Sequence, residues 1–372
     1  MRFTEFSGEW KEELLDRIAT LSKGIGIPKE QLSEDGDPCI LYGELYTKYK
    51  SEIIKQVESK TDIDGSKLKR SKANDVIIPC SGETAVDIAT ARCVPFDSIL
   101  LGGDLNVISL HKYDGAFMSY QLNGKRKYDI ARVAQGVSVV HLYGEHLKTI
   151  KTYNPTLPEQ QKIAILLSLL DERIATQNKI IEDLKLLKSA ISLNVLHSDT
   201  WEQFKIKDIA QIGRGRVISS IEISQQKNPT YPVYSSQTSN DGIMGYLDDY
   251  MFEGEYISWT TDGANAGTVF YRNGKFNCTN VCGLLKLIKG FDTHFVSLVL
   301  AEATKKYVSI NLANPKLMNN TMGNIQICLP KLEEQKRISI VFRVLQRLWT
   351  VHNSLLTEYI KQKQYLLSQM FI

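Results

Sequence analysis

Cysteine and histidine, the side chains that most often bind metals or act as nucleophiles, are scattered along this chain. The six cysteines include no Cys-x-x-Cys pair, and the six histidines show no spacing typical of metal ligands. Zinc sites and disulfide frameworks depend on such spacings. We therefore expect no metal site and no disulfides. Reduced thiols, with no signal peptide at Met1–Glu5, predict a cytoplasmic protein.

Catalytic motifs are incomplete or missing. Asn228-Pro229-Thr230-Tyr231 approaches the Asn-Pro-Pro-Tyr motif of amino-methyltransferases, but it lacks the second proline and no Phe-x-Gly-x-Gly cofactor loop accompanies it. The sequence also contains no Walker phosphate loop and no Gly-x-Ser-x-Gly nucleophile elbow. We interpret 228–231 as a proline-marked turn and predict no catalytic residues, so the chain is expected not to be an enzyme.

Polar side chains gather on two predicted loops, where they could hydrogen-bond to base edges in a DNA groove. One loop follows the predicted buried strand 75–79, and the other joins the predicted strands 256–259 and 268–271. A solvated turn is the alternative for every such residue. The candidate base readers are Ser81, Glu83, Thr84, Thr260, Thr261, Asp262 and Asn265.

Short basic runs in the same two modules could contact phosphates. In Arg214-Gly215-Arg216, the central glycine would allow close backbone approach to a phosphate. A charged surface face is the alternative for each run. The candidates are Lys69, Arg70, Lys72, Lys125, Arg126, Lys127, Arg214, Arg216, Lys305 and Lys306.

The overall charge limits how such a protein could bind DNA. The chain has 45 basic and 42 acidic residues, a net charge of +3, and no strongly basic segment. A protein that bound DNA through phosphates alone should be more basic. We therefore expect locally placed basic groups, or phosphate contacts supplied by another subunit. The 372 residues are enough for two cores and contain no apolar run long enough to span a membrane.

Two long helical stretches repeat one another and must position these loops. Leu157-Pro158-Glu159-Gln160 is answered by Leu329-Pro330 and then Glu334-Gln335, and from Glu159 and Glu334 onward the copies run without a gap at an offset of 175. In this alignment Lys331-Leu332 lengthens the second helix entrance. A weaker repeat, at an offset of 191, relates Trp10 to Trp201 and Gly24 to Gly215.

The helical repeats carry the four-three spacing of a coiled-coil seam. Eight of ten seam positions are apolar in each copy, and the polar exceptions match, Gln177 with His352 and Lys188 with Lys363. Two separate amphipathic helices are the alternative. The predicted seam is Ile163, Leu167, Leu170, Ile174, Gln177, Ile181, Leu184, Lys188, Ile191 and Val195, paired with Ile338, Phe342, Leu345, Trp349, His352, Leu356, Tyr359, Lys363, Leu366 and Met370.

The doubled Leu-Pro and Glu-Gln helix entrances, together with the module starts at Trp10 and Trp201, resemble the DNA-specificity subunit of a Type I restriction-modification system. This resemblance covers the whole chain. It implies two target recognition domains that read a bipartite double-stranded DNA target. It also implies a non-catalytic role and the docking of two methyltransferase subunits and of motor-nuclease subunits. S-adenosylmethionine, ATP and magnesium are implied for those partners and not for this chain.

The expected architecture is an α+β fold with two mixed recognition domains, residues 1–157 and 200–329. They are separated by long spacer helices, residues 158–199 and 330–372, which pair as an antiparallel coiled coil with pseudo-twofold symmetry. A helix over 163–195 would span ~48 Å, or on the order of 14 base pairs. The pair is therefore predicted to act as a ruler between half-sites. A protein-binding scaffold with the same layout is the alternative function.

Overall fold

The computed structural model describes residues 2–196, 198, 200–309 and 314–371. The chain forms two compact units, one comprising Met1–Ile180 with His352–Ile372 and the other comprising Ile181–Val351. The two longest helices, α7 (Leu157–Val195) and α12 (Leu332–Met370), each contribute one part to each unit.

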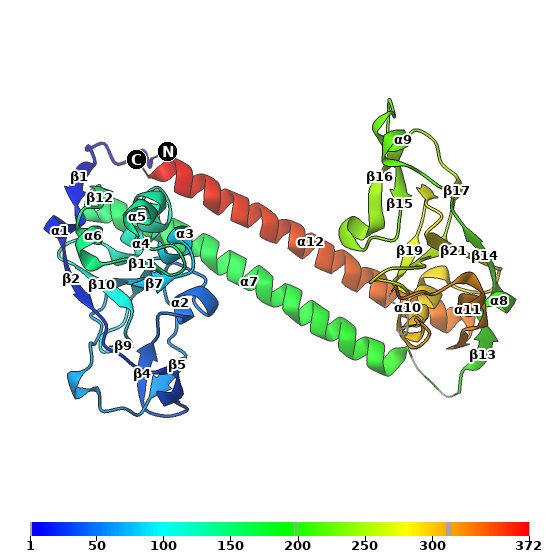
Figure 1. The fold of residues 1–372 in the computed structure, drawn as a ribbon, viewed down its shortest axis with the longest axis horizontal. Coiled ribbons are helices and arrows are strands. Elements are labelled where there is room, and N and C mark those ends of the chain that lie inside the picture. The colour runs from blue at the N-terminus through cyan, green and yellow to red at the C-terminus, as the bar shows by residue number, and fades with distance from the viewer. Residues whose placement is uncertain (1, 197, 199, 310–313, 372) are drawn as a thin grey trace. The chain divides into compact units, whose positions relative to one another are not determined.

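The first unit is built on two small four-stranded sheets, ordered β2-β10-β6-β8 and β3-β5-β4-β9 (Figure 1). The strand β1 pairs with β12 immediately before α7. The strands are β1 (Lys11–Leu14), β2 (Ala19–Lys23), β3 (Leu32–Ser33), β4 (Asp37–Ile40), β5 (Ser59–Thr61), β6 (Asp75–Pro79), β7 (Ser81–Gly82), β8 (Arg92–Val94), β9 (Leu100–Leu101), β10 (Leu105–Leu110), β11 (Val140–His141) and β12 (Lys151–Asn154). The helices are α1 (Leu15–Ile18), α2 (Glu44–Thr47), α3 (Ala85–Ile88), α4 (Gly115–Asn123), α5 (Lys127–Val133) and α6 (Gly144–Lys148).

The second unit repeats this plan with sheets ordered β14-β21-β18-β19 and β16-β15-β20-β17, and with β13 paired to β22 before α12. The strands are β13 (Glu202–Lys205), β14 (Ala210–Arg214), β15 (Tyr231–Tyr234), β16 (Ile243–Leu247), β17 (Phe252–Glu253), β18 (Tyr256–Thr260), β19 (Val269–Arg272), β20 (Lys275–Cys278), β21 (Cys282–Leu287) and β22 (Gln326–Leu329). The helices are α8 (Ile206–Ile209), α9 (Ser220–Ser224), α10 (Thr293–Ala303) and α11 (Asn319–Asn324).

One parallel strand pair marks the repeat inside the sheets. β4 runs parallel to β9 in the first unit, and β15 runs parallel to β20 in the second, whereas the other strand pairs are antiparallel. In each unit a short connection then leads from the parallel pair into the strand of the other sheet, β9 to β10 and β20 to β21. The two units therefore share the parallel pair and the order of the other sheet, while the sheets that hold the pair differ in one outer strand.

The long helices pack on one another inside each unit. In the first unit, Ile163 and Leu167 near the start of α7 share a core with Met370 and Phe371 at the end of α12. In the second unit the roles are exchanged, because Ile338 and Phe342 near the start of α12 share a core with Leu196, just beyond α7. In both units the start of one long helix packs against the end of the other, so the two helices are antiparallel. The predicted fold class is therefore confirmed.

The predicted seam residues face inward with one exception. His352 Nδ1 donates to Gln177 Oε1 at 2.7 Å, so one matched polar pair meets across the seam. Lys188 is exposed, whereas its counterpart Lys363 is half-buried. The buried seam residues are Ile163, Leu167, Ile181, Ile338, Phe342, Leu345 and Met370. The half-buried ones are Leu170, Ile174, Gln177, Leu184, Ile191, Val195, Trp349, His352, Leu356, Tyr359, Lys363 and Leu366.

The second helix entrance is not lengthened, so that prediction is wrong. α12 begins at Leu332, and α7 begins at Leu157. These two residues are separated by the same offset as Glu334 and Glu159. The strands β12 and β22 are displaced by the same interval. Pro330 therefore corresponds to Pro155 and not to Pro158.

The turn after β19 is not a hairpin turn. An Asn-Gly pair such as Asn273-Gly274 favours hairpins, but β19 and β20 belong to different sheets. Gly274 instead exchanges backbone hydrogen bonds with Gly254. The Asn-Gly pair thus marks a passage from one sheet to the other.

Candidate nucleic-acid interface

Strand ends bring four loops of the second unit to one edge. The end of β14 pairs with the start of β21, at Arg214 and Gly283, and the end of β18 meets the same start, at Thr260 and Cys282. The ends of β15 and β20 lie side by side in the parallel pair. The loops 215–219, 235–242, 261–268 and 279–281 therefore leave the sheets at a common edge, which we call the second loop edge.

The loop after β18 holds four predicted base readers, and two of these predictions do not fit. Thr260 and Thr261 are 1% and 2% exposed, and their hydroxyls donate to the backbone carbonyls of Asn265 and Val281. Such side chains build the loop and cannot reach a base. Asn265 is exposed and Asp262 is half-buried, so both remain accessible on the second loop edge.

The Arg214-Gly215-Arg216 run also differs from its prediction. A Cβ on Gly215 would lie 1.8 Å from the carbonyl oxygen of Cys278, so the glycine is required for close approach of protein backbone and not of a phosphate. Arg214 Nε donates to Asn319 Oδ1 at 2.9 Å. Arg216 forms an ion pair with Glu222, which raises the arginine's pKa through their hydrogen bond. Both guanidinium groups are engaged within the unit.

The loop 235–242 is a polar segment of the second loop edge that our sequence analysis missed. Asn240 and Asp241 adopt positive φ angles of 49° and 53°, a left-handed conformation that Asn and Asp tolerate better than most residues. Arg272, only 2% exposed, forms an ion pair with Asp241 and lies 3.6 Å from the ring centroid of Tyr234. The run Ser-Ser-Gln-Thr-Ser-Asn-Asp-Gly was the available signal, since nearly every side chain in it can hydrogen-bond to bases.

The first unit has a corresponding edge, formed by the end of β6 and the starts of β8 and β10. Ser81 and Glu83 follow β6 at this edge, and Glu83 is exposed. Thr84 caps α3, with its hydroxyl accepting from the Asp87 amide at 3.1 Å. Of these three predicted readers, Glu83 and Thr84 are exposed and Ser81 is half-buried, and Thr84 also has a structural role as the helix cap.

The predicted basic residues of the first unit do not all gather at this edge. Lys72 lies next to the start of β6, the opposite end of that strand from Ser81. Arg70 forms a 2.6 Å ion pair with Asp37, and the Lys69 carbonyl accepts from the Leu101 amide. The structure thus separates Lys72 from the predicted base readers of this unit.

Two basic runs occupy corresponding positions in the units. Lys125, Arg126 and Lys127 follow α4, and Lys305 and Lys306 follow α10. Arg126 packs over the Tyr153 ring at 5.0 Å and pairs with Asp129, and Lys305 pairs with Glu302 at 2.7 Å. Lys125 and Lys306 are exposed. Their exposure makes them the better phosphate candidates.

Two further features are the cysteines and the side chains that could bind a metal ion. All six cysteines are free, and burial raises the pKa of Cys39 and Cys80 to about 11 and that of Cys93 to about 12. Within residues 2–196, 198, 200–309 and 314–371, no group of three or more His, Cys, Asp or Glu could hold a metal ion.

None of the described helices is long and apolar enough to cross a membrane.

Comparison with known proteins decides the family. Residues 8–186 and 198–361 match the model of the Type I restriction modification DNA specificity domain. The chain belongs to this family. As a specificity subunit, it binds a particular DNA sequence, directs the restriction-modification complex to it, and does not itself catalyse a reaction.

Relatives agree with that assignment, and a solved structure shares the fold. The specificity subunit is 38% identical over 198 residues to the putative type I specificity subunit S.MpnORF201P of Mycoplasma pneumoniae, covering 52% of this chain and 82% of that protein. It is 43% identical over 150 residues to the type I restriction enzyme MpnII specificity subunit of the same organism, covering 40% of this chain and 44% of that protein. The S subunit from M. genitalium has the same fold, with a TM-score of 0.73 at 17% identity over 100% of this chain and 97% of that one.

Proposed function

We propose that each unit of the specificity subunit reads one half of a bipartite DNA target through its loop edge. The observation that supports this is a shared framework with different edge loops. Gly24 and Gly215 occupy matching positions, where a Cβ would lie 1.9 Å from the Gly102 oxygen and 1.8 Å from the Cys278 oxygen. The loops around these fixed points differ, as expected for two readers of different sequences.

The paired helices are proposed to set the number of base pairs between the half-sites. Because α7 and α12 pack antiparallel, a longer spacer requires insertions in both helices at facing positions, and Gln177 and His352 face each other. One heptad inserted after Gln177 and another after His352 would lengthen the helix pair by ~10 Å, or about 3 base pairs. Sequencing the DNA retained by this variant should show a spacer longer by about that number. A heptad added to one helix alone is the control, since it should disrupt the seam.

Two methyltransferase subunits are the proposed partners of the helices. Ile165 and Leu169 on α7 are 60% and 51% exposed, and their counterparts Ile340 and Val344 on α12 are 61% and 51% exposed. Exposed apolar side chains that recur at the helical repeat fit two copies of one partner. These subunits would use S-adenosylmethionine. The same proposal includes a motor-nuclease subunit that uses ATP and magnesium. It also places the complex in the cytoplasm.

The docking proposal is tested by changing one repeat at a time. Ile165→Glu or Ile340→Glu alone should reduce the stoichiometry measured by mass photometry from two methyltransferase subunits to one, and the double variant should bind none. Lys179→Glu, at an exposed position of α7, is the matched control and should retain two. Loss of both subunits from a single variant would contradict two independent docking sites.

A further inference from the structure

The starts of α7 and α12 form equivalent sites whose aromatic frame is nearly identical. The Trp10 and Phe117 rings lie 5.8 Å apart in the first unit, and the Trp201 and Phe295 rings lie 5.9 Å apart in the second, both edge to face. A glutamate on the first turn of the long helix accompanies each pair, Glu159 in α7 and its equivalent Glu334 in α12.

In the first unit this site is filled by the segment that precedes Trp10. Arg2 donates from Nε and Nη2 to the two carboxylate oxygens of Glu159, both at 2.7 Å, and Trp10 Nε1 donates to the same carboxylate at 3.3 Å. The Glu159 side chain is 0% exposed. Phe3 packs against the adjoining core, and Lys162 lies 4.7 Å from its ring. A planar guanidinium paired with a buried carboxylate is a strong and directional interaction.

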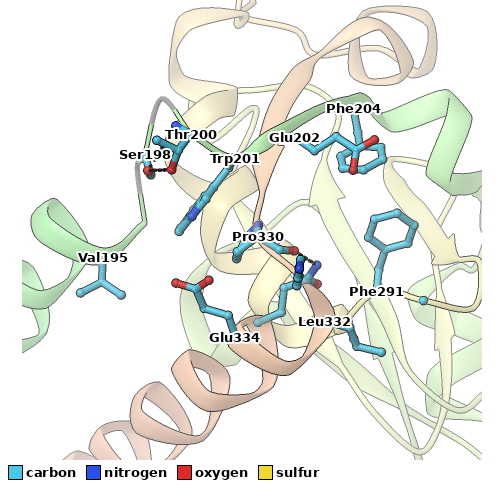
Figure 2. A pocket seen from close by; sticks show the side chains of 13 residues that line it. Val195, Ser198, Thr200, Trp201, Glu202, Phe204, Phe291, Pro330, Leu332 and Glu334 are labelled. Atoms are coloured by element: carbon cyan, nitrogen blue, oxygen red, sulfur yellow. Dashed lines mark hydrogen bonds between the residues drawn. The ribbon is translucent and has the colours of Figure 1, made fainter.

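In the second unit the same site is a cavity. It has a volume of about 900 Å³, and Trp201, Phe291, Glu334 and Gln335 contribute to its wall. Figure 2 shows Glu334 at the start of α12, with Trp201 from the segment before β13 on the same wall. Glu334 is exposed. Among the described residues, no side chain forms a hydrogen bond or ion pair with the Glu334 carboxylate. We call this space the Glu334 cavity.

We propose that the Glu334 cavity binds an arginine side chain presented by the methyltransferase subunit. The first unit shows the chemistry that this frame accepts, a guanidinium on the carboxylate beside a tryptophan, with an aromatic residue next to the arginine. A second copy of this chain is a poor source, because its Arg2 is already paired with its own Glu159. Glu334 also lies two helical turns before Val341, which is exposed. Val341 in turn lies between Ile340 and Val344, the two residues of the proposed docking face on α12.

This inference rests on the proposed partner and can fail separately from it. Glu334→Gln keeps the size of the side chain and removes its charge. Titration of the methyltransferase subunit onto the full chain should show affinity about tenfold weaker for this variant. Glu333→Gln, its exposed neighbour on the same turn, is the matched control and should bind as the unchanged chain does. Equal affinities for the two variants would overturn the inference, whereas loss of DNA selection by the unchanged complex would instead overturn the proposed function.

The identity of the ligand side chain is tested with a peptide. A synthetic peptide of residues 1–9 should bind the full chain, and it should bind about tenfold more weakly to Glu334→Gln. The same peptide with Arg2→Gln should lose a similar factor. Equal binding of both peptides would overturn the arginine assignment. Self-association of the chain that Glu334→Gln abolishes would overturn the choice of partner.

Discussion

Gln335 and Gln160 make the same two hydrogen bonds at equivalent positions of the two long helices. Gln160 Oε1 accepts from the Asp114 amide at 2.9 Å and Gln335 Oε1 accepts from the Asp292 amide at 3.0 Å. Each glutamine also donates, at 2.8 Å, to the carbonyl of the proline that precedes its helix. Each long helix is thus joined to the start of a domain helix, α4 or α10, by a buried amide.

Gln335→Ala should lower the free energy of unfolding of the specificity subunit by about 2 kcal/mol. The change leaves the buried Asp292 N–H and Pro330 C=O without partners, and such groups cost about 1–3 kcal/mol each to leave unpaired. Urea denaturation measures the effect. Lys336→Ala, at the exposed neighbouring position, should change stability by less than about 0.5 kcal/mol. Equal effects would mean that the amide bridge contributes nothing specific.

Gly215→Ala should destabilise the second unit by about 1–3 kcal/mol, the usual cost of overpacking. The added methyl would overlap the Cys278 carbonyl, a backbone group that cannot rotate away. Gly213→Ala is the control two residues earlier on β14, where a Cβ meets nothing within 4 Å. Calorimetry of both variants provides the comparison. A Gly215→Ala protein as stable as Gly213→Ala would show that the backbone approach is not required.

Lys363→Met should destabilise the first unit by about 3 kcal/mol near neutral pH, because it leaves buried carboxylates unpaired. Lys363 Nζ lies 2.5 Å from Glu52 and 2.6 Å from Asp171. Burial acts to raise the pKa of Glu52, but the Lys363 ammonium, the Arg92 charge and a backbone hydrogen bond together outweigh it, and the pKa is lowered. Burial raises the pKa of Asp171, and the nearby Glu52 charge adds to the increase.

The pH dependence of this variant has a definite sign. With its pKa lowered, Glu52 stabilises the unchanged protein above its unfolded pKa, and this contribution is lost as the pH falls through the folded value. Without Lys363 the carboxylates take up protons more readily in the folded state. The deficit of Lys363→Met should therefore shrink between pH 7 and pH 5, as measured by urea denaturation. Lys361→Met, which loses only an exposed pair with Glu358, should show no such trend.

Asn265 and Lys306 should affect DNA binding in different ways. Asn265→Ala should relax the preference at one position of one half-site, because a well-formed amide contact discriminates bases by about 1–3 kcal/mol. Lys306→Gln should weaken binding to all sequences alike and reduce the salt dependence by about one phosphate contact. Fluorescence anisotropy with a set of mutated duplexes, at several salt concentrations, separates the two effects. Identical behaviour of the variants would contradict the assigned roles.

The repeat was predictable from the sequence, whereas the loop contacts were not. Period and offset predicted the helix pairing, and Trp10, Trp201, Gly24 and Gly215 identified matching positions of the domains, because a shared framework imposes the same side chains at the same places. Thr260 and Thr261 were misplaced because sequence alone does not show whether a loop hydroxyl points to solvent or to a neighbouring carbonyl. Arg272 escaped notice because its partners Tyr234 and Asp241 are distant in the chain.

Exchange of residues 200–329 for the corresponding domain of another family member tests the central claim most directly. The exchanged complex should be assembled with its methyltransferase, and the DNA that it methylates should be sequenced. We predict that one half-site changes to the donor's sequence, while the other half-site and the spacer length stay as they were. A change in both half-sites would contradict the account of two independent readers on a common helical spacer.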